Sequence, residues 1–234
     1  STLDRSSAAS DVYKRQLARD DAKTVGLIGT GRQARTQLMA VASVRPIEMV
    51  RVFGRDPERR TTFVREMNEL LSCDIIGMDN GENCVRDADI VIAATNASDP
   101  VVFGSWLTSG CHLNAVGANS YARRELDNAA VMHASLIATD DLGQAQVEAR
   151  ELIDLTSDGK LAWADVAELG ELVQEQKPGR QNSEDITLFK SLGVALEDVA
   201  FGNNTFITTG YVEGVNSGII LSSSDNGTSW DNVT

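Results

Sequence analysis

The chain of 234 residues carries 34 Asp and Glu against 21 Lys and Arg, so its formal net charge is −13 at pH 7. This negative balance argues against a general partnership with nucleic acid or with an anionic membrane surface. Hydrophobic residues make up 42% and charged residues 24%, an ordinary globular composition that can bury a core.

The first 16 residues differ from the rest of the chain. They are polar and rich in Ser and Ala, with no sustained apolar face. Residues 6–16 resemble a translated sequencing-adapter tail, and a frayed N-terminal helix is the alternative interpretation. We therefore expect residues 1–16 to be a disordered or foreign tail, and the folded domain to begin at Leu17.

A glycine-rich motif separates the first predicted strand, Thr24–Ile28, from a predicted helix that begins at Arg32. In this context G-x-G-x-x-A is typical of dinucleotide binding: the glycines allow a tight turn and a close approach of the pyrophosphate, and the last small residue lets helix and strand pack. Free N–H groups at the helix N-terminus would face the phosphates. A plain tight turn is the alternative. The predicted cofactor residues here are Gly29, Thr30, Gly31, Arg32, Gln33 and Ala34.

Strands and helices alternate along the following hundred residues. Strands are predicted at 49–53, 74–77, 89–94, 112–117 and 135–139, and helices at 58–71 and 80–87. Residues 143–176 predict acidic helices, and residues 185–195 a strand that turns into a helix. This alternation predicts an α/β fold with a doubly wound parallel sheet, a Rossmann-type NAD(P)-binding domain over residues 17–200.

The end of the second strand bears on the choice of cofactor. A site that prefers NAD usually has Asp or Glu there to accept from the ribose hydroxyls, whereas this sequence has Gly54 followed by Arg55. A guanidinium can pair with a 2′-phosphate. The sequence thus favours NADP(H) over NAD(H). The alternative is a solvated Arg55, with Asp56 on the ribose.

Polar side chains follow two later strands, where such sheets bind ligands. Thr95 and Asn96 could contact the nicotinamide ribose, although an ordinary turn explains them equally well. Asn119 leaves the next strand and is the candidate for the reaction centre. His112 and His133 fit structural roles better, since one opens a buried strand and the other ends an apolar helix.

Three stretches, residues 25–34, 113–127 and 185–193, together resemble the ornithine cyclodeaminase/mu-crystallin family. That family also contains archaeal-type alanine dehydrogenases and ketimine or pyrroline-carboxylate reductases. The resemblance covers about residues 17–200. It implies that Arg32 and Gln33 lie on the cofactor phosphates and Arg55 near the adenosine ribose. It also implies that the nicotinamide side is lined by Thr95, Leu113, Asn114, Ala115 and Val116.

The resemblance implies an amino or imino acid as the small-molecule substrate. In the cyclodeaminase, the position of Asn119 is an aspartate that acts as acid and base, and asparagine cannot exchange a proton at ordinary pH. We therefore expect an imine reductase (ketimine or pyrroline-2-carboxylate) or an amino-acid dehydrogenase. Ornithine cyclodeaminase activity is one alternative, and NADPH binding without turnover, as mu-crystallin's resemblance suggests, is another.

Family members have a second domain, built mainly from about their first hundred residues and their C-terminus. It holds the substrate carboxylate and usually forms the homodimer interface. We expect this chain to lack most of that domain and the dimer interface, and so to be nearly inactive compared with an intact relative.

The last 34 residues, from Phe201, change character again. Residues 201–210 and 218–223 predict strands, and Ser223–Trp230 matches S-x-D-x-G-x-x-W. That pattern resembles the Asp-box of sialidase-like β-propeller repeats, in which Asp225 would accept N–H groups of a hairpin turn. A single repeat cannot bury its own hydrophobic face. We therefore expect residues 201–234 to be an Asp-box β-hairpin fragment in a chimera joined near Ala200, with a natural fusion as the alternative.

The cysteines at positions 73, 84 and 111 show neither zinc-ligand spacing nor a disulfide framework. We expect reduced structural thiols and no metal. The sequence has no run of about 18 apolar residues and no signal peptide at its start, so we expect a cytoplasmic protein without a membrane partner.

Overall fold

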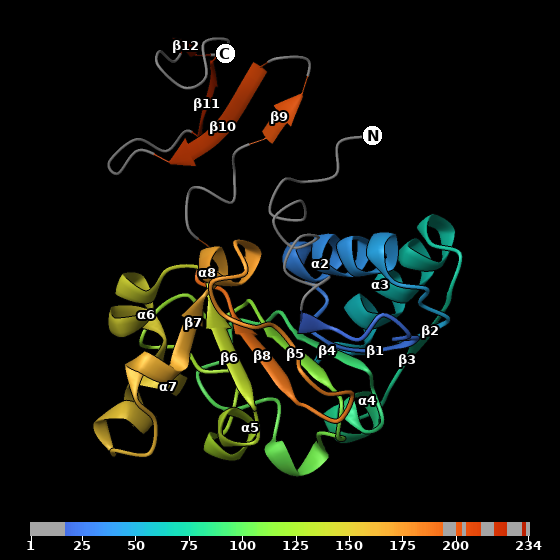
Figure 1. The fold of residues 1–234 in the computed structure, drawn as a ribbon. Helices are drawn as coiled ribbons and strands as arrows, with labels where there is room; N and C mark the ends of the chain where they lie inside the picture. Colours follow the sequence, from blue (N-terminus) through green and yellow to red (C-terminus); the bar gives the residue numbers. More distant parts are fainter. Residues whose placement is uncertain (1–16, 194–199, 203–204, 212–217, 224–230, 233–234) are drawn as a thin grey trace.

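An eight-stranded sheet forms the centre of the computed structural model, which describes residues 17–193 and, for their backbone, residues 200–202, 205–211, 218–223 and 231–232 (Figure 1). The strand order is β3-β2-β1-β4-β5-β8-β6-β7, and every neighbouring pair is parallel. Because β2 and β4 flank β1 on opposite sides, the sheet is wound in both directions from its middle. The predicted α/β fold with a parallel doubly wound sheet is confirmed.

The elements of this domain follow one another closely along the chain. The strands are β1 (Thr24–Ile28), β2 (Met49–Phe53), β3 (Asp74–Gly77), β4 (Ile90–Ala93), β5 (His112–Ala115), β6 (Leu136–Thr139), β7 (Val166–Glu168) and β8 (Thr187–Lys190). The α-helices are α2 (Arg32–Val44), α3 (Pro57–Leu70), α4 (Gly81–Val85), α5 (Asn128–Met132), α6 (Leu142–Glu148), α7 (Arg150–Ser157) and α8 (Leu169–Val173). Two 3₁₀ turns span Gly104–Trp106 and Trp163–Asp165.

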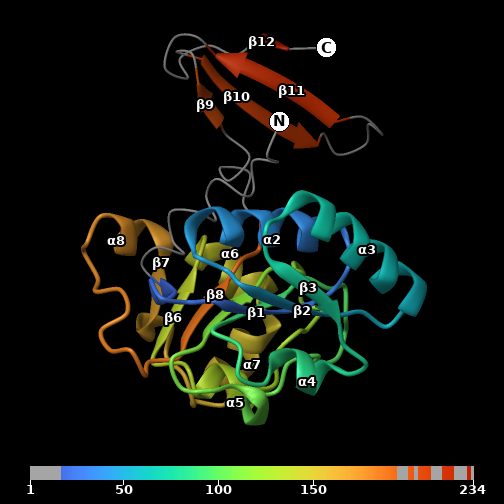
Figure 2. The same ribbon diagram turned by 90° about the vertical axis from the view of Figure 1, so that its right-hand side faces the viewer.

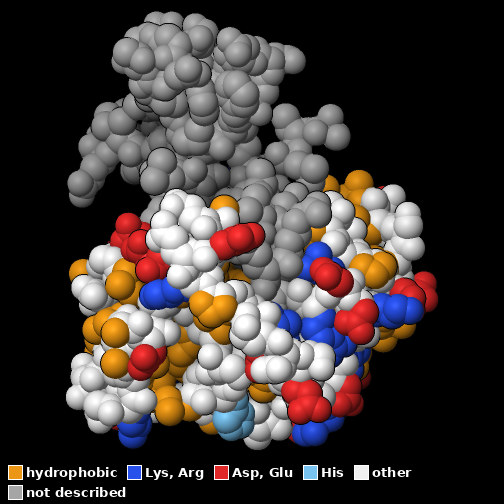
Figure 3. All heavy atoms as spheres, viewed as in Figure 1, with side chains coloured by type: hydrophobic (Ala, Val, Ile, Leu, Met, Phe, Trp, Pro, Cys, Tyr) orange, Lys and Arg blue, Asp and Glu red, His pale blue; other side chains and the backbone are white. Residues whose placement is uncertain are grey.

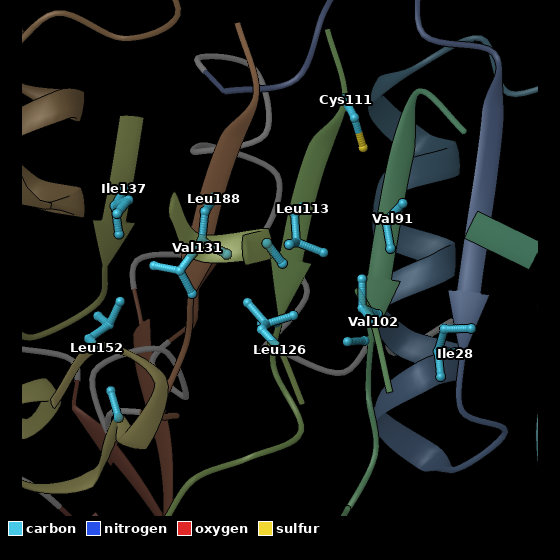
Figure 4. Packing of buried hydrophobic residues seen from close by; sticks show 14 of the residues in the cluster. Ile28, Val91, Val102, Cys111, Leu113, Leu126, Val131, Ile137, Leu152 and Leu188 are labelled. Carbon is cyan, nitrogen blue, oxygen red and sulfur yellow. The ribbon is translucent and has the colours of Figure 1, made fainter. Parts of the chain in front are cut away.

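Helices cover both faces of the sheet, so its central strands β4, β5 and β8 are buried along their whole length, with polar residues such as His112 and Asn114 among the apolar ones (Figure 2). On one face, α2 and α3 pack through Leu38, Val41 and Phe63 onto β1 and β2. On the other face, Leu126 and Val131 pack in one cluster with Leu113 and Leu188 of the central strands (Figure 4). The central strands are therefore closed to water on both faces, whereas the edge strand β3 keeps exposed residues. The ends of the central strands are left for ligands.

The space-filling view shows acidic and basic side chains interspersed on the face it presents (Figure 3). No helix in the described part of the chain is long and apolar enough to cross a membrane. Within that same part, no group of three or more His, Cys, Asp or Glu is placed to hold a metal ion.

One short strand, β7, was missed by the sequence analysis. It lies within residues 143–176, for which the acidic composition predicts helices, and it pairs with β6 at the edge of the sheet. Val166 and Ala167 are its only buried residues. Two apolar residues are too few for a strand pattern to outweigh the helical pattern around them.

The described residues from 200 onward form a separate antiparallel sheet of order β12-β11-β10-β9. Its strands are β9 (Ala200–Gly202), β10 (Thr205–Tyr211), β11 (Gly218–Ser223) and β12 (Asp231–Asn232). Residues 218–223 form β11 as predicted, whereas the range 201–210, predicted as one strand, contains parts of both β9 and β10. Residues 224–230 of the expected Asp-box turn lie outside the described residues, as do residues 1–16 and residues 194–195, the end of the segment predicted to turn from strand into helix.

The three cysteines are free thiols, and two of them are inaccessible. Burial raises the pKa of Cys84 and of Cys111 from 9.0 to about 12, and partial burial raises the pKa of Cys73. Because thiolate is the reactive form, we expect one thiol, Cys73, to react with a disulfide reagent at pH 8 in the folded protein, and all three after denaturation. Rapid reaction of all three thiols without denaturant would contradict this packing.

The raised pKa values of the buried thiols also predict how the free energy of unfolding changes at alkaline pH. An unfolded thiol ionises near its ordinary value, whereas buried Cys84 and Cys111 keep their protons up to about pH 12. The unfolded state thus binds fewer protons in this range, and the free energy of unfolding should fall as pH rises from about 9 to about 12. Chemical denaturation across that range measures the slope.

Candidate functional site

A pocket of about 580 Å³ opens at the carboxyl ends of β1, β2, β4 and β5. From β1 the chain adds β2 and β3 on one side of the sheet and then crosses to add β4 and β5 on the other side. Open α/β sheets bind their ligands at such a change of direction. The volume is within the range of sites for small molecules and cofactors. Ten of the residues predicted for the site line this pocket: Gly29, Thr30, Gly31, Arg32, Gln33, Arg55, Thr95, Asn96, Val116 and Asn119.

The two glycines of the G-x-G-x-x-A motif, Gly29 and Gly31, differ in what their positions require. Gly29 has φ +118°, and a Cβ there would lie 2.3 Å from the carbonyl oxygen of Ala94, so the fold itself requires glycine. A Cβ on Gly31 would meet nothing within 4 Å, and its φ of −85° suits any residue. The protein's own packing therefore places no demand on Gly31, and the space beside it is open to a ligand.

Helix α2 begins at this space with an uncapped N-terminus. Gly31 is the N-cap and has no side chain to accept from the first N–H groups, and the first turn contains no acidic residue. Arg32 and Gln33 are exposed on the pocket wall, while Ala34 is fully buried beneath them. Unsatisfied N–H groups, the helix dipole and a guanidinium together favour an anion such as a phosphate.

Two arginines lie on the pocket wall beyond the end of β2. Arg55 and Arg59 are both exposed, and Asp56 lies between them in the sequence. One oxygen of Asp56 accepts from the backbone N–H groups of Glu58 and Arg59, at 3.0 and 3.1 Å, and so caps α3. Its other oxygen lies 3.4 Å from Nε of Arg59. Asp56 is thus engaged with its own helix.

The opposite end of the pocket is formed by the loops after β4 and β5. Thr95, Asn96, Val116 and Asn119 lie there, and Oδ1 of Asn119 accepts from Nη1 of Arg123 at 3.1 Å. Asn119 therefore has a fixed polar partner on the pocket wall. The loops carry no histidine: buried His112 contacts Oγ1 of Thr187 at 2.9 Å through Nδ1, and His133 caps the end of α5 outside the pocket.

Three residues expected on the nicotinamide side do not reach the pocket. Leu113, Asn114 and Ala115 are fully buried within β5, and only the next residue, Val116, lines the wall. The Nδ2 group of Asn114 donates to Oε1 of Gln37 at 3.1 Å, so it ties β5 to α2 inside the core. Residues inside a strand covered by helices on both faces have no route to a site at the strand ends.

The sequence analysis missed Glu125, a fully buried carboxylate behind the pocket. Its oxygens accept from backbone or hydroxyl groups of Thr95, Gly117 and Ala118. Burial raises the pKa of this carboxyl, opposed by the nearby Lys190 ammonium and by the donors on Thr95 and Gly117. Its stretch is one of those that resemble the family, but the sequence does not single out Glu125, because it follows two arginines in a polar segment that is typical of an exposed loop.

Comparison with protein-family models decides the family. The model of the ornithine cyclodeaminase/mu-crystallin family matches residues 1–206. The chain belongs to this family. The match includes residues 1–16 and extends past Ala200, and none of these comparisons supports an Asp-box or a chimera.

Relatives within the family include reductases of a cyclic imine. Delta(1)-pyrroline-2-carboxylate reductase of Bacillus cereus is 36% identical over 199 residues, which cover 85% of this chain and 61% of that protein. The Thermococcus litoralis reductase of the same name, solved with NADH and L-proline, is 40% identical with a TM-score of 0.79, over 82% of this chain and 60% of that one. This chain thus spans about three fifths of the length of these relatives.

A dehydrogenase of the family has the same fold over this region. An archaeal alanine dehydrogenase, solved as a dimer with bound NAD, is 31% identical with a TM-score of 0.76, over 82% of this chain and 59% of that one. The dinucleotides named in these two structures are NADH and NAD. They support a nicotinamide dinucleotide site in the family and leave the predicted preference for NADP(H) as a proposal.

Proposed function

We propose that this family member binds a nicotinamide dinucleotide in the pocket at the carboxyl ends of β1, β2, β4 and β5, and serves the reduction of a cyclic imino acid. The observation that carries the proposal is the open space at Gly31, directly before the uncapped N-terminus of α2. Similarity to two pyrroline-2-carboxylate reductases, at 36% and 40% identity, supports the choice of reaction.

The residues present fit such a cofactor. Gly31, Arg32 and the first turn of α2 would hold the pyrophosphate, and the loops at Thr95 and Val116 would flank the nicotinamide. The cofactor supplies the hydride at C4 of its ring, and the protein supplies binding and orientation. Apolar side chains of Ile28, Phe53 and Val101 on the pocket wall limit the access of water.

NADP(H) is the proposed form of the cofactor. A site for the unphosphorylated ribose needs a carboxylate that can accept from both hydroxyls, and Asp56 already accepts from two N–H groups of α3. The exposed guanidinium group of Arg55 stands on the same wall and would pair with a 2′-phosphate, whereas Arg59 already lies against Asp56. The sequence indicated that a carboxylate for the ribose is missing at the end of β2 and that Arg55 follows there. The exposed place of Arg55 on the pocket wall supports its role as the positive charge that would balance a 2′-phosphate.

The nature of Asn119 favours reduction over cyclodeamination. Among the described residues that line the pocket, Asp56 is the only carboxylate, and it lies at the end near α3, where it caps that helix. Asn119, at the nicotinamide end, holds a hydrogen bond to Arg123 and cannot take up or release a proton. Hydride transfer to a C=N bond, with the proton supplied by water, needs no acid or base at this position.

An asparagine at position 119 also supports a second candidate function, the binding of NADPH without turnover. No described residue that lines the pocket is placed as an acid or base at the nicotinamide end. One experiment separates the candidates. The chain is incubated with NADPH and excess Δ1-pyrroline-2-carboxylate, or with L-ornithine and NAD⁺, and NADPH, L-proline and ammonia are measured.

We expect slow, imine-dependent oxidation of NADPH, with one L-proline formed for each NADPH consumed. Release of ammonia from L-ornithine would instead assign cyclodeaminase activity. Binding of NADPH without any product would assign the second candidate, and a chain that binds no dinucleotide would contradict both.

A further inference from the structure

Glu125 joins the two loops that form the nicotinamide end of the pocket. Its Oε1 accepts from the backbone N–H of Thr95 at 2.6 Å and from the Thr95 hydroxyl at 2.8 Å. Its Oε2 accepts from the backbone N–H groups of Gly117 and Ala118, at 2.8 and 3.0 Å. Thr95 follows β4 and Gly117 follows β5, so one carboxylate binds the ends of two neighbouring strands.

Two further buried charged residues, Glu151 and Lys190, fix the surroundings of the Glu125 carboxylate. The backbone N–H of Glu125 donates to Oε1 of Glu151 on α7 at 2.9 Å, and both glutamates are at most 1% exposed. Lys190, at the end of β8 and 1% exposed, donates through Nζ to the carbonyl oxygen of Ala118. The ammonium lies close enough to lower the pKa of Glu125 against the effect of burial. A buried charge with four donors and a nearby opposite charge is a rigid part of the structure.

The two loops are in direct contact where this carboxylate joins them. A Cβ on Gly117 would lie 2.1 Å from the Thr95 carbonyl oxygen and 2.6 Å from Oε1 of Glu125, so no side chain fits between the loops. Both Thr95 and Gly117 line the pocket, whereas Glu125 does not. The carboxylate therefore fixes the spacing of two pocket walls without reaching the ligand.

We propose that Glu125 is a positioning residue that holds the β4 and β5 loops in the conformation that receives the nicotinamide half of the dinucleotide. The inference rests on the proposed function. It assigns no part to Glu125 at the adenosine half, since that end of the pocket is formed by α2, Gly54 and Arg55. Within the described part of the chain, the hydrogen bonds of Glu125 go to Thr95, Gly117, Ala118 and Glu151 instead.

The test compares a whole dinucleotide with a ligand that has no nicotinamide. In Glu125→Gln, an amide NH₂ takes the place of one carboxylate oxygen. This NH₂ is a donor and would face N–H donors, so the two loops should lose the acceptor that they share. We expect the Kd for NADPH to rise by about tenfold and the Kd for ADP to stay within about twofold. The nicotinamide fluorescence of bound NADPH should also shift toward that of free NADPH.

Asp89→Asn is the matched control. Asp89 accepts from the N–H groups of Lys23 and Thr24, both at 2.9 Å, and from Arg19, at the opposite edge of the sheet. It is a carboxylate with similar partners and no contact with the pocket, so both Kd values should stay unchanged. Equal weakening of NADPH and ADP in Glu125→Gln, or no change in either, would overturn the inference while leaving the proposed function standing.

A measurement on the unsubstituted chain covers the case in which Glu125→Gln does not fold. The amides of Thr95, Gly117 and Ala118 should exchange with deuterium at least about a hundredfold more slowly than unprotected loop amides, because each donates to Glu125. Fast exchange of these three amides would refute the positioning role. If the unsubstituted chain binds neither NADPH nor ADP, the proposed function fails and the inference fails with it.

Discussion

Gly31→Val should abolish dinucleotide binding and leave the fold intact. Gly31 has an extended backbone that valine adopts readily, and a Cβ there would meet nothing within 4 Å of protein. The branched side chain would instead fill the space in which a pyrophosphate must approach the N-terminus of α2. We expect the Kd for NADPH to rise by about a hundredfold or more, with the melting temperature changed by no more than about 3 °C.

Gly170→Val is the control for this substitution. A Cβ on Gly170 also meets nothing within 4 Å, but the residue lies in α8, away from the pocket. It should keep the affinity for NADPH. Unchanged binding in Gly31→Val would mean that no phosphate approaches this glycine, and the open space would then need another explanation.

Arg55→Glu should reverse the preference between the two nicotinamide dinucleotides. Arg55 is exposed on the pocket wall after β2, where a 2′-phosphate on the adenosine ribose would lie. Substitution by glutamate removes the counter-charge and adds an acceptor for ribose hydroxyls. We expect NADPH to bind about 30-fold more weakly and NADH to bind as well as before or slightly better.

Arg65→Glu provides the matched charge change. Arg65 is an exposed residue of α3 that does not line the pocket, so it reports the effect of overall charge alone. Its affinity for NADPH should change by less than about twofold at 0.15 M salt, because exposed charges beyond a Debye length are screened. An equal loss in the two variants, or an equal loss of NADH and NADPH in Arg55→Glu, would contradict a phosphate contact at Arg55.

The sequence predicted the sheet well because its central strands are short apolar runs with clear ends. Thr24–Ile28 and Met49–Phe53 have the predicted bounds, and α3 (Pro57–Leu70) lies within one residue of the predicted helix at 58–71. The glycine motif also indicated which strand end opens onto the pocket. These features are local, so a single sequence contains them.

The parts that were missed depend on contacts between distant segments. Glu125 is buried only because Thr95, Gly117 and Lys190 surround it, and its neighbours in the sequence give no sign of this. Leu113 to Ala115 were assigned to the site as one stretch, whereas a closed sheet exposes only the residue beyond the last pair of β5 and β4. The resemblance indicated residues 113–116, and the packing of the sheet leaves only Val116 of them on the pocket wall.

Calorimetric titration of NADPH into the purified chain tests the central claim most directly. The open space at Gly31 predicts saturable binding of one NADPH per chain, with a Kd in the micromolar range and competition by NADH and by ADP. A folded chain that releases no heat with NADPH or NADH, and shows no protection of its melting temperature by either, would contradict the assignment of this pocket to a dinucleotide.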